Sequence, residues 1–250
     1  MRLFSFIVVC ILLFANIGSA HFRRLHRTMP NAVVLPPNMG CLRDASTLST
    51  AQSWGSLSGM VIDSKTRKPI PNVVVFLEPP KGVHFPISEQ DKRRPDLVVQ
   101  LPQGGAFDFS ILLHYPHFVV NNLEAPTGQR LILLGDSHQD HAFTLVSKGA
   151  NTSAIVGARE KVTLNLRPSR LPTIMESSTY PELKAKIYVF DHPYHTLSDK
   201  DGRFHMPRVP TGSTITLMAW REDVGWLLTR SGRPLTLQPG QNVVDIEATE

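Results

Sequence analysis

The chain has 250 residues, 42% of them hydrophobic and 19% charged, which is the balance of a globular protein with one large or two small domains. Its formal net charge of +5 is small, and much of the excess of positive charge lies in His21–Arg27. The remaining charge is too low for the strongly basic surface of a nucleic-acid-binding protein. Its two cysteines, Cys10 and Cys41, exclude a framework of several disulfides and a cysteine-rich zinc site.

Residues 1–20 have the features of a secretory signal peptide. Arg2 precedes the apolar run Leu3–Ile17, and the small residues GSA at positions 18–20 offer a cleavage site. We therefore expect an exported protein, either secreted, periplasmic or located at the cell surface. The alternative is an uncleaved membrane anchor, which the arginines after the run would favour. We expect the protein to be attached to a membrane only if this segment is retained as an anchor.

Residues 21–55 have the composition of a disordered leader. Proline, asparagine, serine and threonine are frequent there, and the apolar fragment AVVLPP is cut short by its prolines. Cys41 lies in this leader, and after cleavage at residue 20 it would be the only cysteine. We therefore expect a free thiol at Cys41.

From Ser58 onward the sequence predicts an all-β fold. Short β-rich runs recur between turn residues, and no segment of ten or more residues has a convincing helical period. Many short strands joined by turn residues are typical of one β-sandwich or two. Loops are predicted over Pro79–Pro95 and Arg167–Tyr180. The clearest expected strands are Gly59–Ile62, Val73–Leu77, Leu97–Gln100, Arg130–Leu134, Ala142–Val146, Lys161–Leu166, Lys186–Phe190, Ser213–Trp220 and Asn242–Ile246.

Two stretches with distinctive turns lie near the two ends of this β-rich region. In Gly59–Pro79 a strand leads through the stiff turn PIPN into a second strand. In Leu197–Trp220 the tight turn DKDG, in which Gly202 can take a positive φ, is followed by RFHM and by VPTG before a long strand. Together they resemble the carboxypeptidase-regulatory-like, transthyretin-type β-sandwich. More than 110 residues separate the two stretches here, so the resemblance implies a discontinuous domain, 58–80 plus 191–250, with another domain inserted.

The inserted segment, residues 81–190, contributes two further stretches. In PTGQRLILLGDSHQDHAFTLVS, residues 126–147, a Gly-Gln turn leads into a strand, and a polar loop then leads to His141 at the next strand. The second stretch, YPELKAKIYVFDHPYHTLSDKDGRF, covers residues 180–204, and in it the run YVFDHPY is followed by DxDGRF where the chain enters the outer domain. These stretches resemble exported cupredoxin-like proteins related to methylamine-utilization proteins. The resemblance implies a cupredoxin-like Greek-key β-sandwich inserted in, or packed on, the transthyretin-like β-sandwich.

The same resemblance implies a degenerate copper site. A blue-copper centre needs a thiolate, two imidazoles and a weak thioether ligand. His141 stands at one ligand position, whereas the positions of the cysteine, the second histidine and the methionine hold Ser177, Tyr180 and Leu183. No Cys or His occurs between residues 155 and 190, so a shift in register would not restore these ligands. We therefore expect no copper, no other cofactor and no electron transfer.

Three functions are open to such a chain, and we favour the first. It is a non-catalytic binding or structural protein with an unidentified surface or periplasmic partner, since the sequence carries no complete nucleophile elbow, phosphate loop or zinc-protease motif. The second is a periplasmic metal-binding protein in which His138, Asp140 and His141 hold copper or zinc, with a further ligand from His114, His117 or Asp136. The third is a carbohydrate-binding β-sandwich, which would need an exposed platform of aromatic side chains.

Two histidines mark the point where the chain returns to the outer domain. His192 and His195 flank Pro193-Tyr194. Because half-buried histidines usually find hydrogen-bond partners, we predict a hydrogen-bonded turn at this crossing.

Overall fold

The computed structural model describes residues 52–248 except 104, 116–117, 121–122 and 137. These residues form strands in five sheets and include no helix, so the all-β prediction is confirmed. None of them belongs to a helix long and apolar enough to cross a membrane. The expected signal peptide and most of the leader lie outside the described residues. The first strand begins at Trp54, so the last two residues of the expected leader are part of the fold.

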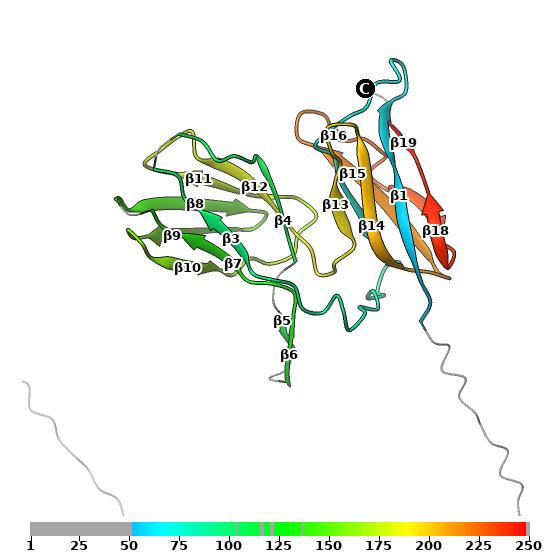
Figure 1. Cartoon of the computed structure of the whole chain (residues 1–250), viewed down its shortest axis with the longest axis horizontal. Coiled ribbons are helices and arrows are strands. Elements are labelled where there is room, and N and C mark those ends of the chain that lie inside the picture. The colour runs from blue at the N-terminus through cyan, green and yellow to red at the C-terminus, as the bar shows by residue number, and fades with distance from the viewer. Residues whose placement is uncertain (1–51, 104, 116–117, 121–122, 137, 249–250) are drawn as a thin grey trace, which may run out of the picture. The chain divides into compact units, whose positions relative to one another are not determined.

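Strands from both ends of the described chain build one β-sandwich, which we call the outer sandwich (Figure 1). Its strands are β1 (Trp54–Asp63), β2 (Val74–Glu78), β13 (His195–Leu197), β14 (Arg203–Pro210), β15 (Thr214–Arg221), β16 (Gly225–Trp226), β17 (Arg233–Thr236), β18 (Gly240–Val243) and β19 (Ile246–Ala248). One sheet has the order β14-β1-β18, with β19 also on β1, and the other has the order β13-β2-β15-β16, with β17 also on β15. β1 lies antiparallel to β14 but parallel to β18 and β19.

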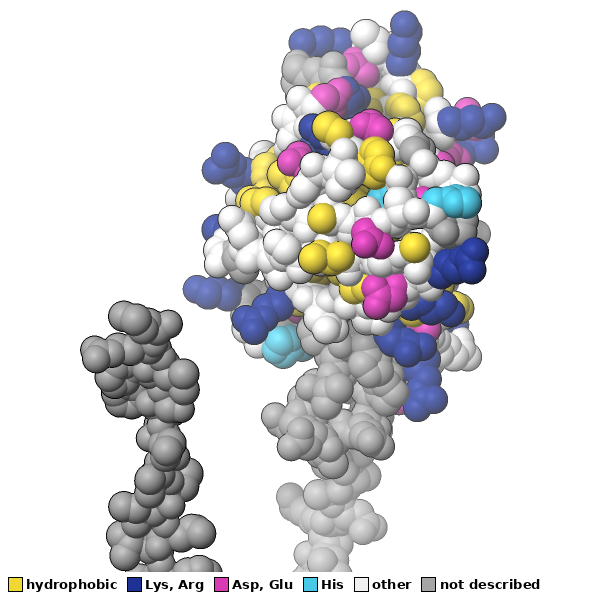
Figure 2. All heavy atoms as spheres, turned by 90° about the vertical axis from the view of Figure 1, so that its left-hand side faces the viewer, with side chains coloured by type: hydrophobic (Ala, Val, Ile, Leu, Met, Phe, Trp, Pro, Cys, Tyr) yellow, Lys and Arg dark blue, Asp and Glu magenta, His cyan; other side chains and the backbone are white. Residues whose placement is uncertain are grey.

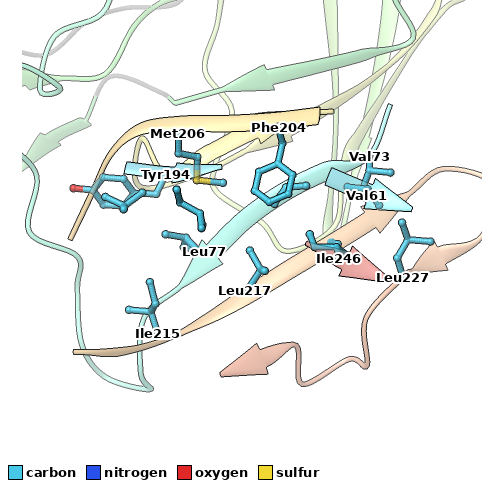
Figure 3. Close-up of a cluster of buried hydrophobic side chains, with 14 of the residues drawn as sticks. Val61, Val73, Leu77, Tyr194, Phe204, Met206, Ile215, Leu217, Leu227 and Ile246 are labelled. Carbon is cyan, nitrogen blue, oxygen red and sulfur yellow. The ribbon is translucent and has the colours of Figure 1, made fainter. Parts of the chain in front are cut away.

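The outer sandwich has its own apolar core between these two sheets. Figure 3 shows Phe204 and Met206 of β14 on the same side of the core, with Leu77 of β2 and Leu217 of β15 opposite them. The turn before β14 is the DKDG turn of the sequence, and its Gly202 has a φ of 71°, as the motif predicted. Burial of these apolar side chains is the main force that holds the outer sandwich together.

The remaining strands build a second β-sandwich, the insert sandwich. Its strands are β3 (Leu97–Gln100), β4 (Ile111–His114), β7 (Leu131–Leu134), β8 (His141–Ser147), β9 (Ala150–Val156), β10 (Lys161–Leu164), β11 (Thr173–Ser177) and β12 (Lys184–Val189). One sheet has the order β10-β7-β3 and the other the order β4-β12-β11-β8-β9. Between β4 and β7 in the sequence, β5 (Phe118–Val120) and β6 (Leu123–Thr127) pair with each other as a small hairpin. A second apolar core, which includes Leu133 of β7 and Phe143 of β8, fills this sandwich.

A third apolar cluster joins the two sandwiches. We call it the junction cluster; its buried members are Val74, Phe76, Ile111, Tyr188, Phe190 and Met218. Neighbouring residues on β2 and β12 point into the sandwich cores, so both faces of these strands are buried. This explains why VVVFL and KIYVF read as continuous apolar runs rather than as alternating ones.

Polar contacts reinforce the junction. Arg170 donates to both carboxylate oxygens of Glu78 at 2.6 and 2.9 Å, and its guanidinium lies 5.3 Å from the centre of the Trp226 ring. Lys186 of the insert forms an ion pair with Glu222 of the outer sandwich.

Two predicted loops differ from expectation. Residues 167–180 contain β11, which pairs with both β8 and β12 in the interior of a sheet, so the prediction of a loop there was wrong. Residues 79–95 contain no strand, as predicted, but they are not simply exposed: Phe85 packs on the core of the outer sandwich, and Asp91 forms an ion pair with Arg208 at 3.0 Å.

Candidate functional site

His141, the expected remnant of a copper site, opens β8 and is fully buried. Its Nε2 lies 3.5 Å from Oδ2 of Asp136, and its Nδ1 has no hydrogen-bond partner among the described protein groups. The ring lies beside two aromatic rings, with centroid distances of 6.1 Å to Phe143 and 5.5 Å to Tyr180. His141 is therefore enclosed by packed side chains instead of facing solvent or an open site.

The other three expected ligand positions lie at the end of β11 and in the turn that follows it. Ser177 pairs with Phe143 across the β11–β8 ladder, and Tyr180 contacts the His141 ring. Leu183 is fully buried in the core of the insert sandwich. Its backbone N–H donates to Tyr180 O at 2.9 Å, and its carbonyl accepts from the Ser177 N–H at 2.9 Å, which closes the turn.

Each of these side chains already has a structural partner. The Ser177 hydroxyl accepts hydrogen bonds from the backbone N–H groups of Thr179 at 3.2 Å and Tyr180 at 3.0 Å. The Tyr180 hydroxyl donates to the side-chain oxygen of Gln139. Leu183 supplies only apolar contacts. A hydroxyl that shapes a turn, a phenol bound to an amide and a leucine in the core offer no ligand set for a soft metal ion.

Asp136, which the sequence suggested only as a possible further metal ligand, is the hydrogen-bonding neighbour of His141. Its side chain is buried, and its Oδ1 accepts hydrogen bonds from the backbone N–H groups of His138 at 2.7 Å and Gln139 at 3.1 Å. These N–H groups, the first above all, lower the pKa of Asp136, and the neighbouring His141 contributes in the same direction. The carboxylate therefore stays charged and fixes the loop that leads into β8. The sequence feature that could have indicated this contact is the position of Asp136 five residues before His141.

The alternative metal site is not assembled as a cluster. His138 and Asp140 are exposed, whereas His141 is fully buried. The Asp140 carboxylate accepts the backbone N–H of Ala158 at 3.0 Å. Within the described part of the chain, no three His, Cys, Asp or Glu side chains form a group that could hold a metal ion.

The three tryptophans do not form an exposed platform. Trp54 is partly buried and packs on the core of the outer sandwich. Trp220 and Trp226 are partly buried against the junction cluster, where Trp220 contacts Tyr188 at 5.1 Å between ring centroids. All three rings therefore contribute to packing.

The surface near the insert sandwich mixes both signs of charge. Figure 2 shows one face, on which dark-blue Lys and Arg side chains lie mainly around the outline and magenta acidic side chains lie among them. Yellow hydrophobic side chains occur there in small groups. Near the His141 site, an open groove of about 570 Å³ runs past Asp136, Arg159 and Gln100.

Comparison with protein-family models, curated proteins and solved structures gives no match.

Proposed function

We propose that this chain is an exported, non-catalytic binding or structural protein in which a cupredoxin-like insert has lost its copper site and a transthyretin-like sandwich carries it. The observation that carries the proposal is the use of the four ligand positions. The side chains at these positions are already engaged in packing or hydrogen bonding, apart from Nδ1 of His141. The four residues are His141, Ser177, Tyr180 and Leu183. A metal centre would have to displace all of these contacts.

The junction supports a scaffolding role. Two sandwiches with separate cores are joined by the junction cluster and by the Arg170–Glu78 and Lys186–Glu222 pairs. Such a connection holds two binding faces in one arrangement, which a flexible linker would not do. The partner would be a protein or another ligand at the cell surface or in the periplasm.

Copper titration tests the loss of the metal site. Cu(II) added to the purified metal-free protein should produce no intense visible band, since that band arises from cysteine sulfur bonded to copper. The melting temperature should change little, because stabilisation by a ligand grows as RT ln(1 + [L]/Kd) and a lone histidine binds weakly. An intense band, or a large melting shift with Cu(II) or Zn(II) that His141→Ala removes, would contradict the proposal and support the metal-binding alternative.

Restoring the missing ligands tests whether these positions correspond to those of a cupredoxin copper site. Ser177→Cys, Tyr180→His and Leu183→Met introduced together should create copper binding with a thiolate absorption band. The matched control moves the thiol by one residue, as Ser178→Cys with the same two partner changes, because Ser178 is exposed. A folded triple variant that binds copper no better than this control would show that the four positions are not a former copper site.

Export is tested separately. The sequence of residues 1–20 leads us to expect cleavage after Ala20, so N-terminal sequencing of the exported chain should begin at His21. Recovery of the full-length chain in the membrane fraction would show instead that the segment is retained as an anchor.

A further inference from the structure

Three histidines gather where the two sandwiches meet. His114 ends β4 of the insert sandwich, His195 begins β13 of the outer sandwich, and His192 lies in the crossing between β12 and β13. The ring of His195 stacks on Phe190 of the junction cluster, with 4.3 Å between centroids and 15° between planes. His192 contacts the same phenylalanine at 5.9 Å. The histidines are therefore part of the packed contact between the sandwiches.

Three of their six ring nitrogens are buried without a hydrogen-bond partner among the described protein groups. His114 and His192 are buried, with 1% and 6% of their surface exposed. His192 Nδ1 accepts the backbone N–H of Tyr194 at 3.1 Å, which is the hydrogen-bonded turn expected from the sequence. Nδ1 of His114 and both ring nitrogens of His195 are buried without a partner among the described protein groups. Neutral rings tolerate such a place far better than charged ones.

The charge of Arg94 also opposes protonation of His195. Arg94 acts on His195 with a like charge; it donates to Pro193 O at 3.1 Å, and its guanidinium lies 5.9 Å from the Tyr115 ring. The nearby carboxylates among the described residues give little compensation. Asp91 is engaged by Arg208, and Asp191 is exposed and lies 3.9 Å from Nε2 of His192. The ring of Tyr194 lies 5.6 Å from that of His192, between centroids, and the ring of Tyr115 faces Arg94.

Burial lowers the pKa of His114 and of His192 from 6.5 to about 4, and for His192 the charge of Asp191 opposes this only in part. The pKa of His195 lies well below 6.5 because of burial first and then of Arg94 and the other two histidines. All three are thus neutral in the packed junction near pH 7. Once exposed to water, each would take up a proton near its ordinary pKa.

The three histidines whose pKa is lowered by burial all lie at the contact between the sandwiches, so acid acts there. His141, another buried histidine of the insert sandwich, differs from them in having a buried carboxylate beside it, since its Nε2 lies 3.5 Å from Oδ2 of Asp136.

We propose that the junction is an acid-sensitive contact, which opens below neutral pH and exposes the facing surfaces of the two sandwiches while each keeps its own core. The direction of the pH effect follows from linkage. Histidines that bind protons more tightly in the open state destabilise the closed state as the pH falls below 6.5. The effect stops growing near pH 4, where the same histidines also become protonated in the closed state. At pH 5, one such histidine favours the open state by about 30-fold. A protein with this property would release or bind its partner in an acidified environment.

The experiment follows the junction and the folds separately between pH 7.5 and 4.5. Trp220 and Trp226 pack on the junction cluster, so their emission maximum should shift to the red, and small-angle scattering should show a larger radius of gyration. The far-UV circular dichroism should keep its β-sheet form, and all changes should reverse at pH 7.5. A scan with no red shift, or one in which the β signal is lost together with it, would overturn the proposal.

Two variants remove titrating groups in different ways. His195→Phe keeps a ring on Phe190 without a charge, and His192→Asn keeps an acceptor for the Tyr194 N–H. Each should move the opening midpoint to lower pH, and the second serves if the first fails to fold. The control, His84→Gln, removes an exposed histidine and should leave the midpoint unchanged. A midpoint that neither folded junction variant moves, or that the control moves equally, would show that these histidines do not govern the opening.

Discussion

Alanine at Gly59 should strongly destabilise the outer sandwich. A Cβ at this position would lie 2.0 Å from the Val244 carbonyl oxygen and 2.9 Å from the Phe204 ring. The oxygen belongs to the backbone that continues from β18 to β19, and the Val244 N–H donates to Ser58 O at 2.8 Å, so it cannot move without breaking the pairing with β1. We expect a loss of roughly 3 kcal/mol or more in the free energy of unfolding.

Urea unfolding followed by circular dichroism measures this change. Ser56→Ala in the same strand adds no atoms and should cost about 0.5 kcal/mol or less. If Gly59→Ala unfolded at the same urea concentration as Ser56→Ala, β1 would not be held between β14 and the C-terminal strands as described.

Leu133→Ala should have a comparable effect on the insert sandwich. Leu133 lies in β7, has no exposed surface and belongs to the core that also contains Leu183. Truncation of a buried leucine costs about 2–5 kcal/mol, because transfer free energy is lost and a cavity remains.

The same chemical change at Leu171 provides the control, since 43% of that residue's surface is exposed. Leu171→Ala should cost well under 1 kcal/mol, of order 0.5. Equal losses at the two positions, measured by urea unfolding, would contradict the placement of β7 in the core.

Much of the strand pattern could be predicted because hydrophobic residues mark it. β2, β3, β7, β8, β12 and β15 all fall on runs that the sequence identified. β11 was missed because its pattern is mixed: Met175 is buried, but so are the polar Thr173 and Ser177, while Ile174 points outward with 36% of its surface exposed. Only the neighbouring strands determine which face of β11 is inside, and a single sequence does not contain that information.

The candidate site was predictable in part for the same reason. The polar loop before His141 marked the start of β8, and the turn after β11 does lie beside it. The partner of His141 depends on how the loop at Asp136 folds back through its bonds to His138 and Gln139. His192 and His195 were interpreted as a local turn because their burial arises from contact between segments far apart in the chain.

The parallel pairing of β1 with β18 and β19 has a consequence for the order of folding during synthesis. β1 and β2 are made first, but their partner strands follow the whole insert sandwich and extend to Ala248. The insert can complete both of its sheets once β12 has left the ribosome, whereas the first two strands must wait with their apolar faces uncovered. Closing the outer sandwich is therefore the last and most non-local step of folding, and the interval before it is when this chain is most exposed to aggregation.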